Sequence, residues 1–351
     1  MLSSTSNSKT PGKTHIVLVL ALCAMFCGSV EFVTEHFFGR VSRIEKRRET
    51  EYRAAVAVRS AQTRRKISTL VVGNSLLLHG IDFPQLQEYV GPELELHRAV
   101  FENTYFLDWY YGLQKMFRAG AQPDLTVLVL SPAQLTSDGI DGDYTVHMLV
   151  DSRDLISFAK DTHADRNGFS VFALDNLSFF FGSRAEVRTW ILGKLLPDLP
   201  NLTRYFRSHY KLSAADESDV LDLADRRLNQ LRSLCERYGT GFILVIPPAV
   251  GDSGVGAVTQ AGVAQGVPVL MPFRPGILPV EDYSDEVHLN STGAGKFTLA
   301  LAADLRKVTR HNTHTETASG VSGSSLFQHF QKSANHVVPA EFATGAVAAS
   351  K

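Results

Sequence analysis

Short runs of aliphatic and β-branched residues alternate with amphipathic helical patterns through most of the chain, and this alternation limits the possible folds most strongly. Two of the runs, 124–131 (DLTVLVLS) and 241–248 (GFILVIPP), are apolar almost throughout, which is typical of strands buried on both faces of a sheet. Strands that alternate with helices in this way favour a parallel sheet with helices on both faces. We therefore predict an α/β fold with strands over 68–74, 94–100, 124–131, 241–248 and 266–272 and helices over 105–120, 219–239 and 291–307.

Residues 138–214 interrupt the alternation, because they are rich in aromatic residues and have the pattern of consecutive helices. We predict that they form a helical insertion packed over one end of the sheet, within a main domain that covers residues 67–309. Residues 310–351 contain mainly Ser, Thr, His, Ala and Gly with few apolar runs. That composition predicts a mostly disordered tail.

An apolar run, residues 16–30 (IVLVLALCAMFCGSV), lies near the N-terminus. It is shorter than the roughly 20 residues that span a bilayer, but Phe32 and Val33 extend it to a marginal span. We predict an uncleaved transmembrane signal-anchor over 15–34, preceded by a cytoplasmic or flexible segment over 1–14. A cleaved signal peptide and a buried core helix are the alternatives that the run leaves open.

The segment that follows, residues 35–66, mixes charges of both signs with alanines, which predicts a solvated helical stalk. Its positive charges lie just after the apolar run, and by charge count alone they favour a cytoplasmic position for that side. The fold and motif arguments below favour a domain outside the cytoplasm, so the two indications conflict. The cations concerned are Arg40, Arg43, Lys46, Arg47 and Arg48.

Charge and cysteine content exclude several classes of function. The chain has 35 Lys and Arg against 36 Asp and Glu, a net charge of -1, whereas a nucleic-acid-binding protein normally carries a basic excess. Cys23 and Cys27 lie in the apolar run, which leaves Cys235, in a helical pattern, as a buried small hydrophobic residue. We expect no nucleic-acid partner, no metal cluster and no cofactor.

Ser75 follows the first predicted strand directly, in the stretch 69–80 (TLVVGNSLLLHG). In an open parallel sheet ligands bind beyond the carboxyl ends of the strands, and a reactive serine there needs a base and a carboxylate that orients the base. Asp285 and His288 lie three residues apart, after the last predicted strand and on the same rim. We predict a catalytic triad of Ser75, His288 and Asp285.

Each signal alone is weak, because a serine at a strand end is commonly a turn residue and an Asp before a helix is commonly a cap. His79 is interpreted as a surface or core histidine.

Two stretches, VVGNSLLLHG (71–80) and DEVHLNSTGAGKF (285–297), resemble the first and last motif blocks of the SGNH (GDSL-like) hydrolases. Gly73-Asn74-Ser75 stands where that family usually has Gly-Asp-Ser. The resemblance implies a flavodoxin-like three-layer fold and the triad of Ser75, His288 and Asp285.

The N-terminal anchor and the variant blocks are similar to those of envelope proteins of this superfamily that O-acetylate alginate or aid D-alanylation of teichoic acids. This narrower likeness implies a serine esterase or O-acyltransferase that acts on acyl esters of cell-envelope polysaccharide. It also implies a periplasmic or otherwise extracytoplasmic catalytic domain, attached to the membrane by its N-terminal helix, and a membrane acyltransferase as a partner.

The chain departs from the family pattern at the oxyanion hole. The stretch 100–106 (VFENTYF) lacks the glycine expected after the second strand, and Ala133 stands roughly where the third block has an asparagine. The candidate donors are the N–H of Ser75 and the side chains of Asn103 and Gln134, although the last two residue types are also typical of helix caps. One missing donor costs roughly 3 kcal/mol of barrier.

The sequence therefore leaves open slow acyl transfer, or a non-catalytic binding or assembly factor of the cell envelope. A flavin or nucleotide binder is disfavoured, because the turn after the first strand lacks the glycines of a phosphate-binding loop.

Overall fold

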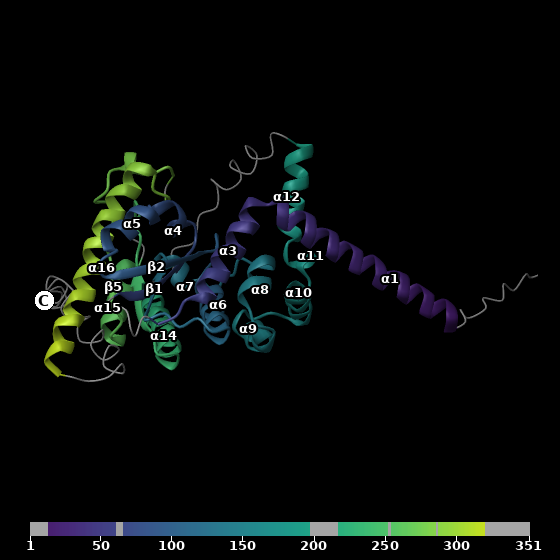
Figure 1. Ribbon diagram of the computed structural model, residues 1–351, viewed down its shortest axis with the longest axis horizontal. Helices are drawn as coiled ribbons and strands as arrows, with labels where there is room; N and C mark the ends of the chain where they lie inside the picture. The colour runs from purple at the N-terminus through teal and green to yellow at the C-terminus, as the bar shows by residue number, and fades with distance from the viewer. Residues whose placement is uncertain (1–12, 61–65, 197–216, 252–253, 286, 320–351) are drawn as a thin grey trace, which may run out of the picture.

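The computed structural model describes residues 13–60, 66–196, 217–251, 254–285 and 287–319 (Figure 1). Among them, five parallel strands form one sheet in the order β2-β1-β3-β4-β5, which is the flavodoxin-like doubly wound order. The predicted α/β class with a parallel sheet is therefore confirmed. The strands are β1 (Ile67–Gly73), β2 (Leu94–Val100), β3 (Leu125–Val129), β4 (Gly241–Val245) and β5 (Val269–Leu270).

Helices cover both faces of the sheet, as the continuous apolar character of its central strands requires. Alternate side chains of each strand enter different cores: Leu70 and Leu128 pack into one, and Val71 and Val127 into the other. The first core is covered by α6 (Phe106–Arg118), α14 (Glu217–Arg237) and α15 (Val255–Gln265), and the second by α4 (Ser75–Gly80), α5 (Phe83–Val90) and α16 (Ser291–Ser319).

The segment after β3 forms a series of short helices that ends at Leu195 and packs beside α6. At Gly112 of α6 an added Cβ atom would lie 3.2 Å from the side chain of Leu149, so glycine allows the two helices to approach closely. Residues 197–214 of the predicted insertion lie outside the described residues. The helices are α7 (Pro132–Thr136), α8 (Asp143–Leu149), η2 (Ser152–Asp154), α9 (Leu155–Asp161), α10 (Arg166–Leu177), α11 (Phe179–Gly182) and α12 (Arg184–Leu195).

The N-terminal apolar segment forms one continuous helical stretch that projects from the domain (Figure 1). It consists of α1 (Lys13–Val33) and a π-helical turn, η1 (Thr34–Phe38), and is followed by the short α2 (Gly39–Val41). Within the described part of the chain, Lys13–Phe38 is the one helical stretch long and apolar enough to cross a membrane. A signal sequence meets the same criterion, so the transmembrane anchor stays a prediction.

The helix after α1 does not stand free in solvent, which corrects the prediction of a solvated stalk. Helix α3 (Arg43–Ala57) is capped by Ser42, whose Oγ accepts the N–H of Glu45 at 3.2 Å. It lies along β2, the edge strand of the sheet, where the carboxylate of Glu51 accepts the N–H of Val100 at 2.8 Å. The charges of α3 pair with the domain, and a helix of this kind protects an exposed strand edge.

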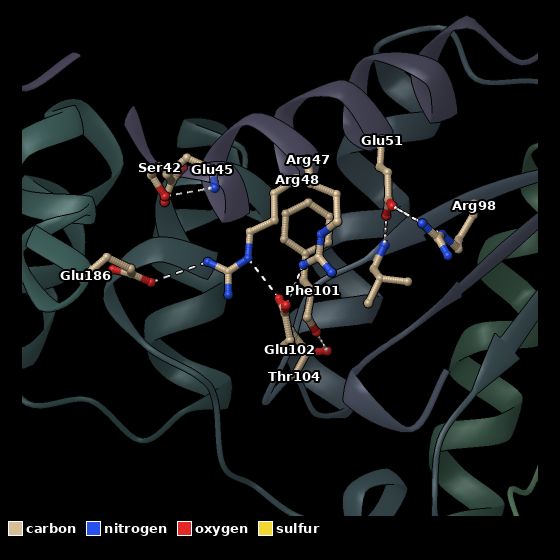
Figure 2. A network of polar contacts seen from close by, with 11 residues as sticks. Ser42, Glu45, Arg47, Arg48, Glu51, Arg98, Phe101, Glu102, Thr104 and Glu186 are labelled. Carbon is tan, nitrogen blue, oxygen red and sulfur yellow. Dashed lines mark hydrogen bonds and ion pairs between the residues drawn. The ribbon is translucent and has the colours of Figure 1, made fainter. Parts of the chain in front are cut away.

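Arg47 and Arg48 join α3 to the loop after β2 and to the helical insertion (Figure 2). Both side chains bind the carboxylate of Glu102, with Arg48 Nε at 3.0 Å, and Arg48 Nη1 also reaches Glu186 of α12 at 3.3 Å. The buried guanidinium of Arg48 lies 4.5 Å from the centre of the Tyr144 ring, a cation–π contact. One arginine therefore holds three segments of the chain together.

The C-terminal helix is longer than expected. Helix α16 continues to Ser319, whereas the sequence predicts that the domain ends at residue 309. The rest of the predicted disordered tail, residues 320–351, lies outside the described residues.

The buried carboxyl of Glu45 makes the free energy of unfolding depend on pH. Burial raises the pKa of Glu45 from 4.5 to about 7, so the folded protein keeps a proton that the unfolded chain releases. A raised pKa gives stability that is present below about pH 4.5 and is lost as the pH rises through about 7. We expect Glu45→Gln to remove this dependence, which amounts to roughly 3 kcal/mol. Urea unfolding at about pH 4.5 and pH 8 measures this dependence. The exposed Glu88→Gln on α5 is the control. Equal pH dependence in Glu45→Gln and the unmodified protein would contradict the prediction.

Candidate active site

Ser75 stands at the first position of α4, immediately beyond the carboxyl end of β1. The preceding Gly73 is required by packing, since an added Cβ atom would lie 2.8 Å from the carbonyl oxygen of Val129 on β3. The strand therefore ends against its neighbour and the chain turns into the helix at once. This turn leaves the Ser75 side chain partly exposed at the rim of the sheet.

Asn74, between these two residues, is fully buried and uses both ends of its amide. Its Oδ1 accepts the N–H of Leu76 at 3.0 Å and caps α4, and its Nδ2 donates to the carbonyl of Thr104 at 2.9 Å. An aspartate, which has no donor when ionised, can make only the first of these bonds. The turn that carries Ser75 is thereby attached to the loop after β2.

The loop that carries Asp285 and His288 folds back on itself before α16. Ser284 N–H donates to the carbonyl of His288 at 2.8 Å, and Asn290 N–H donates to the carbonyl of Asp282 at 2.9 Å. Asn290 Oδ1 accepts the N–H of Thr292 at 3.0 Å and so caps α16. These bonds fix the direction in which the His288 ring points.

The structure brings the three predicted triad residues together. His288 Nε2 lies 2.9 Å from Ser75 Oγ, and His288 Nδ1 lies 2.8 Å from Asp285 Oδ2. The other carboxylate oxygen of Asp285 accepts the N–H of Val287 at 2.9 Å and that of His288 at 2.7 Å. A hydroxyl, an imidazole and a carboxylate in this chain of hydrogen bonds have the geometry of a nucleophile, its base and the group that orients the base.

The ionisation state of Asp285 suits a carboxylate that orients the His288 ring. Partial burial raises the pKa of Asp285, but the N–H groups of His288 and Val287 and the His288 ring outweigh this, so the pKa lies below its ordinary value. The carboxylate therefore stays ionised beside the ring. Its side chain is 55% exposed, against 26% for His288, so water reaches the outer side of the site.

The candidate oxyanion donors, Ser75 N–H and the side chains of Gln134 and Asn103, differ in the hydrogen bonds that they already make. The N–H of Ser75 lies at the first position of a helix, where no intrahelical acceptor is available. The side chain of Gln134 folds back on the start of α7, where its Oε1 accepts Ser131 N–H at 3.1 Å and Ser131 Oγ at the same distance. Gln134 is thus part of a capping box, which favours the cap interpretation over that of an oxyanion donor.

Asn103 has a left-handed backbone with φ of 59°. Glycine adopts this conformation freely, and asparagine tolerates it better than most other residues. The loop after β2 therefore makes a left-handed turn at this position without glycine. The Asn103 side chain is exposed and helps to stabilise the charged form of Asp141, whose pKa burial raises to about 6.

His79 belongs to this neighbourhood, which sequence reasoning missed. Its ring meets that of His288 edge to face, with centroids 5.5 Å apart. Partial burial lowers the pKa of His79, and the charge of His288 lowers it further. The available signal was its position four residues after Ser75, because residues four apart share one face of a helix.

No group of three or more His, Cys, Asp or Glu side chains within the described ranges is arranged to hold a metal ion. Cys235 is buried in α14, as expected for a small hydrophobic residue.

No protein-family model and no curated protein matches the chain. Solved structures that resemble it include two catalytic mutants of Axe2, an acetylxylan esterase from Geobacillus stearothermophilus. The first is 12% identical, with a TM-score of 0.35, and the second 12% identical, with a TM-score of 0.36. Each match covers 71% of this chain and 95% of that chain. Because these scores are low, we assign the fold from the strand order alone.

Asn74→Asp should destabilise the protein, because a buried carboxylate would face the carbonyl of Thr104 without a proton to donate. We expect a loss of about 1–3 kcal/mol in the free energy of unfolding, measured by urea titration near neutral pH. The reverse change at an exposed N-cap, Asp82→Asn on α5, is the control and should alter it by less than about 0.5 kcal/mol. An equally small effect of Asn74→Asp would show that the amide donor is unimportant.

Substitutions at Asn103 should separate backbone conformation from side-chain chemistry. We expect Asn103→Gly to keep the free energy of unfolding within about 0.5 kcal/mol, and Asn103→Val to lower it by roughly 1–2 kcal/mol, because valine is strained at this φ. Denaturant unfolding of the three proteins side by side makes the comparison. If valine were tolerated as well as glycine, the left-handed turn would not be required.

Proposed function

We propose that this protein is a membrane-anchored serine esterase or O-acyltransferase of the SGNH (GDSL-like) type that acts on acyl esters. The observation that carries the proposal is the hydrogen-bond chain from Ser75 through His288 to Asp285. It lies beyond the carboxyl end of β1, next to the switch point of the sheet, where doubly wound folds bind ligands. The resemblance of the two motif blocks to that superfamily supports the same conclusion.

The proposed reaction has two steps. Ser75 Oγ attacks the ester carbonyl carbon while His288 Nε2 takes its proton, and the new oxyanion binds the Ser75 N–H. His288 returns the proton to the leaving alkoxide, and the acyl group stays on Ser75. Water or a sugar hydroxyl then attacks this acyl-enzyme while His288 takes its proton. The acyl–Ser75 bond breaks, and His288 returns the proton to Ser75 Oγ. Asp285 keeps the proton on His288 Nδ1 and stabilises the imidazolium that forms.

Solvent exposure favours hydrolysis by the protein alone. The Asp285 side chain is 55% exposed, so water reaches the site from this side. We propose that transfer to a sugar hydroxyl requires a partner, in the form of a membrane acyltransferase that delivers the acyl group. Acyl esters of cell-envelope polysaccharide on the outer side of the membrane are the proposed substrates. This choice depends on the motif resemblance and on the anchor α1.

A non-catalytic binding or assembly factor is the second candidate, and one observation favours it. Ser75 N–H is a donor by position, but Gln134 serves as a cap and Ala133 has no polar side chain. A site that lacks one oxyanion donor loses about 10²–10³ in rate. Such a protein would keep the fold and the three polar side chains but bind esters without cleaving them.

A fluorophosphonate probe, which reacts with activated serines, tests the proposal. We expect the full-length protein in detergent to be labelled, Ser75→Ala to be unlabelled, and Asp285→Asn to react slower by on the order of 10³–10⁴. The exposed Ser291→Ala, at the start of α16, is the matched control and should be labelled normally.

Each alternative result has a separate meaning. Labelling that persists on Ser75→Ala excludes Ser75 as the nucleophile. An unmodified protein that is folded yet unlabelled, and that does not hydrolyse p-nitrophenyl acetate, supports the binding factor in place of the enzyme.

A further inference from the structure

The helices α10, α11 and α12 lie on the side of the domain from which α1 projects (Figure 1). Hydrogen bonds and a ring contact hold the end of α1 and the turn after it against α11 and α12. The carboxylate of Glu31, near the end of α1, accepts Ser178 Oγ at 2.6 Å and the N–H of Phe179 and Phe180 at the start of α11. Phe37, one turn after α1, meets the ring of Trp190 on α12 edge to face, with centroids 6.2 Å apart. The apolar helix is therefore held against the insertion.

Beside this junction α12 exposes large apolar side chains. Val187, Trp190, Ile191 and Leu195 share one face of α12, and the last three are 37%, 44% and 70% exposed. Phe181 of α11 is 37% exposed next to them in the chain. We call Phe181, Trp190, Ile191 and Leu195 the α12 patch. Several exposed large apolar side chains on neighbouring helices indicate a surface that binds another apolar phase.

The cations around the patch indicate what covers it. Arg188 and Lys194 of α12 and Arg40 and Arg43 beyond α1 are all exposed. Apolar side chains flanked by Lys and Arg on a surface helix are typical of segments that lie in the headgroup region of a bilayer. A tryptophan at such a position is likewise characteristic of membrane interfaces.

The chain also has no spacer between α1 and the domain. Helix α3 begins five residues after Phe38 and lies along β2, fixed by Glu51 and by Arg48. A domain attached to an embedded helix in this way sits directly on the membrane surface.

We propose that the α12 patch inserts into the headgroup region of the same bilayer that α1 crosses. The bilayer is the one occupant to which we commit. A second copy of the chain or another membrane protein is an alternative that the experiment below detects. The inference rests on the anchor included in the proposed function, but it does not depend on the chemistry of Ser75.

Tryptophan fluorescence provides a direct test, because the chain has two tryptophans and the other, Trp109, is fully buried. The full-length protein is placed in lipid nanodiscs that contain phosphatidylcholine brominated near the top of its acyl chains, which quenches nearby tryptophan. We expect lower emission than in unbrominated discs for the unmodified protein, and no such difference for Trp190→Phe.

Two glutamate variants provide the matched comparison. Leu195→Glu in the patch should reduce the quenching of Trp190. Leu299→Glu on α16 alters a leucine that is 57% exposed on the far side of the domain, and it should leave the quenching unchanged (Figure 1).

The possible failures are distinguishable. A protein that enters nanodiscs while Trp190 is unquenched overturns the lipid contact and leaves the anchor intact. If Trp190 is in addition shielded from acrylamide, a protein covers the patch instead of lipid. A folded protein that does not enter nanodiscs overturns both the anchor and the patch. In every case fluorophosphonate labelling reports separately on Ser75.

Discussion

The buried amide of Asn74 is the contact on which the rest of the site depends. It caps the helix that presents Ser75 and, through Thr104, fixes the loop after β2. Two residues earlier in that loop, Glu102 binds Arg47 and Arg48 of α3. Arg48 continues to α12, where the insertion meets the apolar helix. Polar contacts and short covalent segments thus connect the candidate nucleophile to the N-terminal helix without interruption.

This connection involves buried charge, which stabilises a fold only when every partner is in place. Removing water from Arg48 costs free energy that its two carboxylate partners and the face of Tyr144 offset. Such pairs contribute little net stability compared with apolar side chains of equal size, but they allow few alternative arrangements. We infer that their main contribution is to fix α3 against the rim loop in one geometry.

The parts of the fold that sequence reasoning predicted were those with a local pattern. Continuous apolar runs gave the strands, and the rule that ligands bind at the carboxyl rim associated Ser75 with His288 across more than half the chain. The helix α3 was misjudged because alternating charge looks the same whether its partners are water or distant residues such as Glu102. The left-handed turn at Asn103 and the contact of His79 with His288 likewise depend on neighbours that no local pattern reveals. The two-residue β5 was overestimated, since its pairing with β4 is set by tertiary contacts.

The absence of a spacer before α3 has a consequence for where such a protein works. A domain joined to its membrane helix by a long flexible linker can reach substrates over a range of distances from the bilayer. A domain fixed directly to that helix reaches only substrates within a thin layer at one distance from the bilayer. Under the proposed function, a polymer substrate has to present its esters within that layer, as a chain emerging from the membrane does. Material already deposited farther out would be beyond reach, so timing relative to export, more than affinity, would decide which units are modified.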